Sequence, residues 1–197
     1  MVTTPSTMLA LGTVAPDFQL PDTTSGRLVA RDDFTAQPVL LVMFICNHCP
    51  FVKHVASELA RIGRDYRDRG AAIVAISSND AAQYPEDGPE VMARFAASQG
   101  FTFPYLYDET QDVAAAYQAA CTPDLFLFDA DRRLAYRGQL DGSRPSNDAP
   151  VDGRDLRAAL EATLAGRPVP EPQVPSQGCN IKWKPDRAPE FVTIGRA

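Results

Sequence analysis

Residues 39–50 read VLLVMFICNHCP, an uninterrupted apolar run that leads into two cysteines separated by two residues. A short apolar run of this kind is typical of a strand buried on both faces of a parallel sheet. After the cysteines, apolar residues recur at steps of three and four as far as Tyr66, and Gly70 follows, which predicts an amphipathic helix. Cys46 and Cys49 are therefore expected at the junction between a buried strand and a helix.

The sequence on both sides of this junction predicts an α/β fold. The apolar residues 71–77 indicate a second buried strand, so strand, helix and strand follow in the order of a parallel crossover. Capping and turn residues predict the remaining elements: an N-terminal hairpin around Gly26, helices over 89–99, 110–119 and 155–165, a short strand within 101–108, and an antiparallel hairpin of 125–128 with 134–138.

The length of 197 residues suits one hydrophobic core with a modest addition. Residues 1–166 are expected to form that single domain. Residues 167–197 contain six prolines, which exclude a long helix and predict an extended C-terminal tail. The apolar side chains of Cys179, Ile181 and Trp183 favour packing, so we expect the tail to dock on the domain.

Composition excludes several classes of function. A net charge of −6 and a pI near 4.9 oppose binding of nucleic acid, which requires clustered lysines and arginines. The start of the sequence lacks a basic secretory n-region, and no window approaches the ~18 apolar residues of a membrane span. The expected location is therefore the cytoplasm, where structural disulfides are rare. Four cysteines there are more typical of catalysis, metal binding or simple burial.

The CNHC motif is the first candidate site. Two cysteines with this spacing can approach to disulfide distance within one helical turn, and the first turn of a helix stabilises a thiolate. Cys46, taken as the more exposed thiol nearer the helix tip, is the expected attacking thiol, and Cys49 the resolving one. Asn47 and His48 are expected to support them, since an imidazole between the thiols can add positive charge or a hydrogen bond.

A second candidate group is Cys121-Thr122-Pro123, just before the strand at 125–128. Cys121 could form a second redox pair with Cys179 if the tail folds back, a hypothesis that rests on the four cysteines and the dockable tail. The alternative interpretation of Cys121 is a buried cysteine that packs as a small apolar residue. Arg137 and Arg144 could serve an anionic substrate, although single arginines at hairpin ends usually face solvent or pair with acids.

Five segments of the sequence resemble the thioredoxin-like superfamily, more closely its redoxin branch, which is related to alkyl hydroperoxide reductase and thiol-specific antioxidant proteins. All of them except the first also resemble bacterial thioredoxin-like proteins that carry a CNHC motif, and the resemblance covers roughly residues 9–186. The segments are GTVAPDFQL (12–20), FICNHCPFVKH (44–54), ACTPDLFLFD (120–129), YRGQLDGSRP (136–145) and GCNIKWK (178–184).

The resemblance implies a thioredoxin-like fold, with a central mixed β-sheet flanked by helices. It also implies that Pro123 is cis and faces the cysteine pair, and that Thr122 offers backbone hydrogen bonds to an extended substrate. The expected function is that of a thiol-disulfide oxidoreductase. Cys46 attacks a substrate disulfide, and Cys49 resolves the mixed disulfide. The expected partners are a disulfide-bearing protein or small thiol and a dithiol protein as reductant, with no organic cofactor and no metal.

The sequence departs from its relatives at positions that matter for the chemistry. Leu40 and Ile45 stand where thioredoxins usually carry a buried acid and a tryptophan, so proton transfer from Cys49 is expected to use water or His48. Peroxiredoxins carry Pro-x-x-x-Thr-x-x-Cys, whereas Val39 and Met43 occupy the proline and threonine positions counted back from Cys46. A peroxiredoxin-like peroxidase is therefore a weaker alternative.

A metal-binding module is the other alternative. Cys46, Cys49 and His48, with Cys121 or Cys179, could ligate zinc or copper, because thiolates and imidazole suit both ions.

Overall fold

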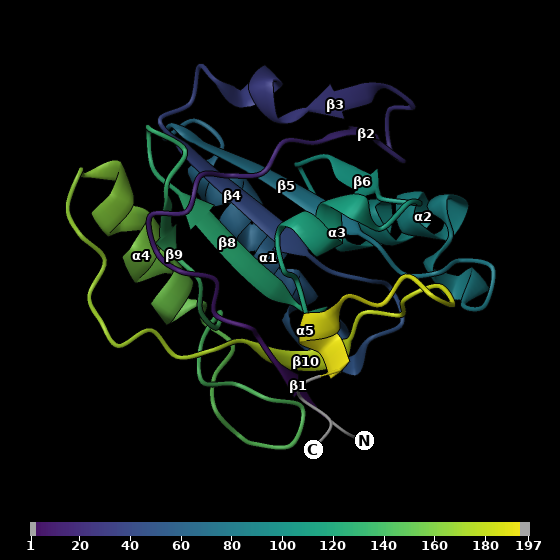
Figure 1. The fold of residues 1–197 in the computed structure, drawn as a ribbon. Helices are drawn as coiled ribbons and strands as arrows, with labels where there is room; N and C mark the ends of the chain where they lie inside the picture. Colours follow the sequence, from purple (N-terminus) through teal and green to yellow (C-terminus); the bar gives the residue numbers. More distant parts are fainter. Residues whose placement is uncertain (1–2, 194–197) are drawn as a thin grey trace.

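A computed structural model, which describes residues 3–193, shows a five-stranded mixed sheet at the centre of the molecule (Figure 1). Its strand order is β6-β5-β4-β8-β9. Strands β4, β5 and β6 are parallel, whereas β8 pairs antiparallel with both β4 and β9. The strands span Val39–Phe44 (β4), Ala71–Ser77 (β5), Tyr105–Tyr107 (β6), Asp124–Phe128 (β8) and Leu134–Tyr136 (β9).

The alternation of side chains along β4 divides the core into two layers. All residues of β4 and β5 are buried, as expected for strands covered on both faces. Leu41 and Met43 pack with residues of α1 (Pro50–Tyr66), α2 (Pro89–Gln99) and α4 (Arg154–Leu164). Leu40 and Val42 point to the other face, where they pack with α3 (Asp112–Ala116) and with the N-terminal segment.

The N-terminal hairpin consists of β2 (Gln19–Pro21) and β3 (Leu28–Ala30), followed by the 3-10 helix η1 (Arg31–Phe34). A smaller sheet has the order β1-β10-β7 and joins β1 (Thr4–Pro5), β10 (Gln177–Asn180) and β7 (Cys121–Thr122). Figure 1 shows β1 and β10 side by side at the end of the molecule opposite to β2 and β3. The segment after α4 therefore packs on the domain, where its strand β10 pairs with β7, just before β8.

The other short elements are the 3-10 helix η2 (Pro85–Asp87) and helix α5 (Glu190–Thr193). Residues 1–2 and 194–197, which belong to the expected domain and tail ranges, lie outside the described residues. Within the described part of the chain, no helix has the length and apolar character needed to cross a bilayer.

Most predicted elements are confirmed, and some are shorter than expected. The hairpin strand predicted over 134–138 ends at Tyr136. Strand β5 and helix α2 have the predicted bounds, and Gly100 ends α2 with a φ of 69°. The helix predicted over 110–119 is reduced to α3, because Gln111 and Gln118 adopt left-handed φ values of 66° and 50°. The strand predicted within 101–108 is reduced to the three residues of β6.

Candidate active site

Cys46 and Cys49 lie between the end of β4 and the start of α1, as predicted. Pro50 begins the helix, a position where the missing N–H of proline costs nothing, and Cys49 is its N-cap. Two premises about Cys46 were wrong. The helix tip is at Cys49, three residues further on, and Cys46 and Cys49 are buried alike, with 1% and 0% of their surface exposed. The helix end therefore acts mainly on Cys49.

Thr122 is the point where the two thiols meet. The Sγ of Cys46 lies 3.4 Å from Oγ1 of Thr122, and the thiol of Cys49 donates a hydrogen bond of 3.1 Å to the Thr122 carbonyl. The Thr122–Pro123 peptide is cis, as the resemblance implied. The short segment between β7 and β8 thus faces the CNHC motif, although 76 residues separate Cys46 from Thr122 along the chain.

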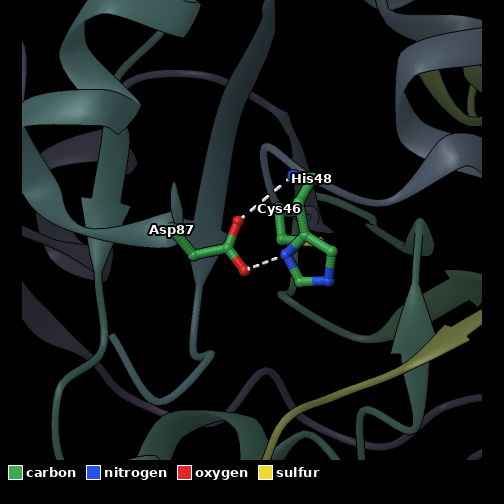
Figure 2. Close-up of side chains that lie close together, drawn as sticks. All are labelled: Cys46, His48 and Asp87. Carbon is green, nitrogen blue, oxygen red and sulfur yellow. Dashed lines mark hydrogen bonds and ion pairs between the residues drawn. The ribbon is translucent and has the colours of Figure 1, made fainter. Parts of the chain in front are cut away.

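An acid that the sequence analysis missed completes the site. Asp87, the last residue of η2, is fully buried and accepts a hydrogen bond of 2.5 Å from Nδ1 of His48. Figure 2 shows this pair beside Cys46. Ligand-type atoms of Cys46, His48 and Asp87 lie within 4.8 Å of one another. Asp87 belongs to a turn-forming stretch, YPEDGP at 84–89, and nothing in that stretch indicates which element it contacts.

The backbone and side chain of Asn47 hold Asp87 and its helix in place. Asp87 accepts hydrogen bonds from the backbone N–H groups of Asn47 (2.8 Å) and His48 (3.2 Å) and from the side-chain amide of Asn79 (2.7 Å). The Asn47 side chain donates to the Glu86 carbonyl and accepts from the hydroxyl of Tyr105. Asn47 is thus a supporting residue, and it acts through η2 and β6.

The imidazole of His48 is held on two sides. Its ring stacks on the ring of Tyr84 with a centroid separation of 5.6 Å. The hydrogen bond and charge of Asp87 raise the pKa of His48 above 6.5. Burial opposes ionisation of Asp87, but hydrogen bonds from His48 and Asn79 outweigh it and lower its pKa below 3.8. Both shifts favour the charged forms of the pair, imidazolium and carboxylate.

The two thiols of the motif have opposite pKa shifts. The pKa of Cys49 is lowered to about 5 because its thiolate accepts hydrogen bonds from Cys46, Cys179 and Thr122 and from the backbone N–H of Val52. The pKa of Cys46 is raised well above 9.0 because its thiol donates to Cys49, and because burial and Asp87 disfavour a second negative charge. Cys49 is therefore the thiol of the pair that ionises first, and on ionisation it loses the hydrogen bond that it donates to the Thr122 carbonyl, while Cys46 keeps its proton.

Cys179 lies at this site, and Cys121 lies on the other side of the strand pair. In the antiparallel pair of β10 with β7, Cys179 is opposite Thr122 and Asn180 is opposite Cys121. Because neighbouring residues of a strand point to opposite faces, Cys121 and Cys179 are not a cross-strand pair. The Cys121 thiol points to the Pro123 carbonyl at 3.6 Å. The structure therefore does not bring the predicted pair together: Cys179 is opposite Thr122 and packs in one buried cluster with Cys46 and Cys49.

The part of the chain that carries this site matches a known protein family. The model of the AhpC/TSA family matches residues 11–137, a range that includes the CNHC motif, Asp87 and the Thr122–Pro123 peptide. The chain belongs to the AhpC/TSA family.

Two named relatives are similar to this AhpC/TSA-family chain. A candidate peroxiredoxin of Mycobacterium tuberculosis is 31% identical over 116 residues, which cover 59% of this chain and 68% of the relative. The thiol-disulfide oxidoreductase ResA of Geobacillus thermodenitrificans is 29% identical over 133 residues, which cover 66% of this chain and 70% of the relative.

Solved structures confirm the thioredoxin-like fold. A crystal structure of an uncharacterized conserved protein from Geobacillus kaustophilus is 56% identical, with a TM-score of 0.92 over 94% of this chain and 98% of that chain. The thioredoxin domain of a thiol-disulfide oxidoreductase from Bacteroides vulgatus is 18% identical, with a TM-score of 0.58 over 76% of this chain and 96% of that chain. At that identity the likeness shows the fold alone.

Among residues 3–193 of the AhpC/TSA-family chain, Cys46, His48 and Asp87 form a group of three potential metal ligands. This differs from the set expected from the sequence, because Cys49 is not in the group and an aspartate is. In the structure, Nδ1 of His48 and the Asp87 carboxylate are already bound to each other. A metal ion would have to replace that hydrogen bond, so the arrangement fits an ion pair better than a ligand set.

The two arginines considered for an anionic substrate have structural partners. Arg137 is completely buried, lies 3.3 Å from Asp124, and has its guanidinium 4.5 Å from the centroid of the Phe126 ring. Arg144 donates to the carbonyls of Asp141 and Ser143. Arg137 therefore belongs to the core of the AhpC/TSA-family domain, and Arg144 stabilises a loop.

Proposed function

We propose that this protein catalyses thiol–disulfide exchange through Cys46 and Cys49. The observation that carries the proposal is the convergence of both thiols on Thr122, at 3.4 Å and 3.1 Å, beside a cis proline. Family membership and a relative named as a thiol-disulfide oxidoreductase support oxidoreductase activity. The substrate would be a disulfide-bearing protein or a small disulfide, and a dithiol protein would supply the electrons.

The first step uses the opposite protonation of the two thiols. Cys46 borders His48, whose side chain is 23% exposed, so Cys46 is the thiol nearer to an incoming substrate. Cys46 attacks one sulfur of the substrate disulfide and passes its proton to the Cys49 thiolate. A bond forms between Cys46 and that sulfur, and the other substrate sulfur leaves as a thiolate. The imidazolium of His48 is placed to donate a proton to it.

The second step closes the motif. Cys49 attacks the Sγ of Cys46, and its proton passes to the substrate sulfur that leaves. The products are a substrate with two thiols and a Cys46–Cys49 disulfide. In the mixed disulfide Cys46 no longer donates a hydrogen bond to Cys49, so Cys179, Thr122 and the backbone N–H of Val52 are the groups that favour its thiolate in this step.

A redox titration with mass mapping tests the proposal. The protein is equilibrated with mixtures of reduced and oxidised dithiothreitol, the remaining thiols are alkylated, and all four cysteines are mapped. A Cys46–Cys49 disulfide that forms in a two-electron transition supports the proposal. A potential near about −270 mV would indicate a reductant and one near about −120 mV an oxidant, and we expect a reductant. If the Cys46–Cys49 disulfide never forms and the protein retains a stoichiometric metal ion, metal binding replaces thiol–disulfide exchange as the proposed function.

Peroxide reduction is the second candidate, because one named relative is a candidate peroxiredoxin. Val39 and Met43 stand at the positions of the peroxide-binding proline and threonine, and both side chains are buried in β4. We therefore expect little peroxide consumption. Consumption at rates of a dedicated peroxidase, lost in Cys46→Ser, would favour this candidate instead.

A cytoplasmic location is part of the proposal. A reducing compartment would regenerate the dithiol form and suits a reductant. Cell fractionation, combined with rapid alkylation of Cys46 and Cys49 in intact cells, measures both the compartment and the resting redox state. Recovery of the protein in an oxidising compartment would reverse the expected direction of electron flow.

A further inference from the structure

We propose that Cys179 is a third redox thiol of this site, which takes the place of Cys46 in an alternative Cys49–Cys179 disulfide. The inference deepens the proposed function and rests on it, because the exchange begins from the Cys46–Cys49 disulfide.

The register of β10 places Cys179 over the active-site cysteines. Cys179 is directly opposite Thr122 in the antiparallel pair of β10 with β7. Directly opposed residues project from the same face of a strand pair. Thr122 is the residue that contacts Cys46 through its hydroxyl and Cys49 through its carbonyl. Thr122 therefore contacts two of the thiols and is the cross-strand neighbour of the residue that carries the third.

The surroundings of the Cys179 thiol support this placement. Cys46, Cys49 and Cys179 belong to one buried apolar cluster, and 8% of the Cys179 surface is exposed. Burial, followed by its hydrogen bond to the Cys49 thiolate, raises the pKa of Cys179 to about 12. When Cys49 is part of a disulfide, its negative charge is absent, and that contribution to the pKa shift of Cys179 disappears.

The tail is held close to Thr122 on both sides of Cys179. A Cβ atom at Gly178 would lie 2.0 Å from the Thr122 carbonyl oxygen, so only glycine allows this approach. Before Cys179, the backbone N–H of Ser6 donates to the Ser176 carbonyl at 2.9 Å. After it, the N–H of Ile181 donates to the Ala120 carbonyl at 3.2 Å. These contacts hold β10 against β7, with Cys179 opposite Thr122, before any disulfide forms.

The exchange is balanced within the protein. Starting from the Cys46–Cys49 disulfide, the Cys179 thiolate attacks the Sγ of Cys49. The Cys49–Cys179 bond forms, the Cys46–Cys49 bond breaks, and Cys46 leaves as a thiolate that takes up the proton released by Cys179. One disulfide replaces another, so no external oxidant is consumed. Cys46 becomes a free thiol beside the partly exposed His48, and the protein remains oxidised through the Cys49–Cys179 disulfide.

Tryptic mapping distinguishes the disulfides cleanly. Trypsin cleaves after lysine and arginine but not before proline, so Cys46 and Cys49 share peptide 32–53, Cys121 lies in 95–132 and Cys179 in 158–182. A Cys46–Cys49 disulfide is internal to one peptide. A Cys49–Cys179 disulfide links 32–53 to 158–182. The full-length protein is oxidised with oxidised dithiothreitol, quenched in acid, alkylated and digested without reduction.

The decisive variant is Cys46→Ser, in which Cys49 is the remaining cysteine of peptide 32–53. We expect most oxidised molecules of this variant to contain the link between 32–53 and 158–182, and the link to disappear in Cys46→Ser/Cys179→Ser. Cys121→Ser is the matched control: added to Cys46→Ser, it should leave the link unchanged. Wild type should contain the internal disulfide together with a smaller linked fraction.

Two results would overturn the proposal. One is a natively folded Cys46→Ser protein, shown by circular dichroism, that never forms the link. The other is a link between 158–182 and 95–132, which would pair Cys179 with Cys121. The proposed function fails separately, because it requires the internal disulfide of 32–53 in wild type. If that disulfide forms and the Cys179 link does not, exchange at the CNHC motif stands and only the third thiol is rejected.

Discussion

The carboxylate of Asp87 lies 2.5 Å from Nδ1 of His48 and is fully buried behind it. The two residues are 39 positions apart in the sequence, and they meet because η2 packs against the loop that carries the CNHC motif. In thioredoxins a residue of the strand before the cysteines carries the acid, and Leu40 of β4 occupies that position here. The acid of this site therefore comes from another element. It contacts the imidazole of His48, and its charge acts on Cys46 as well.

Replacing Asp87 with asparagine should lower the pKa of His48 towards about 6.5, because the carboxylate is the first cause of its elevation. At neutral pH His48 would then be mostly neutral, and disulfide exchange should slow by about tenfold or more, with the loss growing as pH rises. NMR titration of the His48 ring and the pH profile of the exchange rate measure the two effects. Glu86→Gln is the control, since that neighbouring acid contributes less to the His48 shift. An unchanged His48 titration in Asp87→Asn would falsify the assignment.

The same pair predicts a pH dependence of stability. The raised pKa of His48 adds to the free energy of unfolding below about pH 6.5, and this contribution is lost as pH rises through the folded value. The lowered pKa of Asp87 contributes above about pH 4 and is lost as pH falls through its folded value. The difference in unfolding free energy between wild type and Asp87→Asn should therefore be largest between about pH 4 and 6.5. Denaturant unfolding across pH measures it, and a difference that increases towards about pH 9 contradicts the ion pair.

The thiolate of Cys49 depends first on the hydrogen bond from Cys46. Cys46→Ala removes that donor, so the pKa of Cys49 should rise from about 5 by at least one unit, while Cys121→Ser should leave it unchanged. Thiolate absorbance in the ultraviolet, recorded against pH, gives the midpoint, and the rate of alkylation by iodoacetamide confirms which cysteine titrates. A midpoint near 5 that persists in Cys46→Ala would mean that the Val52 N–H and the Cys179 thiol suffice.

Local sequence patterns were enough to predict the elements that carry the CNHC motif. The apolar run of β4, the period of α1 and Pro50 each constrain nearby residues, so the junction could be placed without the structure. The position of the two cysteines relative to the start of the helix could not be predicted. It depends on where the first helical turn begins, and this helix begins after Cys49. The exposure of Cys46 was misjudged for a related reason: its contact with Thr122 joins two residues that are 76 positions apart in the sequence.

Contacts between distant segments were the part that sequence patterns missed. Asp87 lies in a turn with no periodicity, and its partner is fixed only when η2 packs on the CNHC loop. The tail was expected to dock on the domain, but which residue Cys179 faces depends on the register between β10 and β7. A shift of one residue between β10 and β7 would have turned Cys179 away from Thr122.

Arg137 and Asp124 form a buried ion pair, and removal of the arginine should strongly destabilise the fold. Both side chains are 0% exposed, and burial already raises the pKa of Asp124 and lowers that of Arg137. Arg137→Met leaves the carboxylate without its partner, so we expect a loss of about 3–5 kcal/mol in unfolding free energy. Arg137→Met/Asp124→Asn should recover part of the loss because no unpaired charge remains. Denaturant unfolding measures both, and a single variant as stable as wild type contradicts the pairing.

Gly178 should be the least replaceable position of the tail. A Cβ atom there would lie 2.0 Å from the backbone carbonyl oxygen of Thr122, a contact that a flexible side chain could not relieve because the opposing atoms belong to the backbone. Gly178→Ala should therefore cost about 1–3 kcal/mol and separate β10 from β7. Gly142→Ala is the matched control, because nothing lies within 4 Å of its Cβ position. Denaturant unfolding gives the cost, and alkylation of Cys179, buried in wild type, should become faster in Gly178→Ala alone. Equal unfolding free energies and equal alkylation rates in the two variants would mean that the tail does not press against Thr122 in solution.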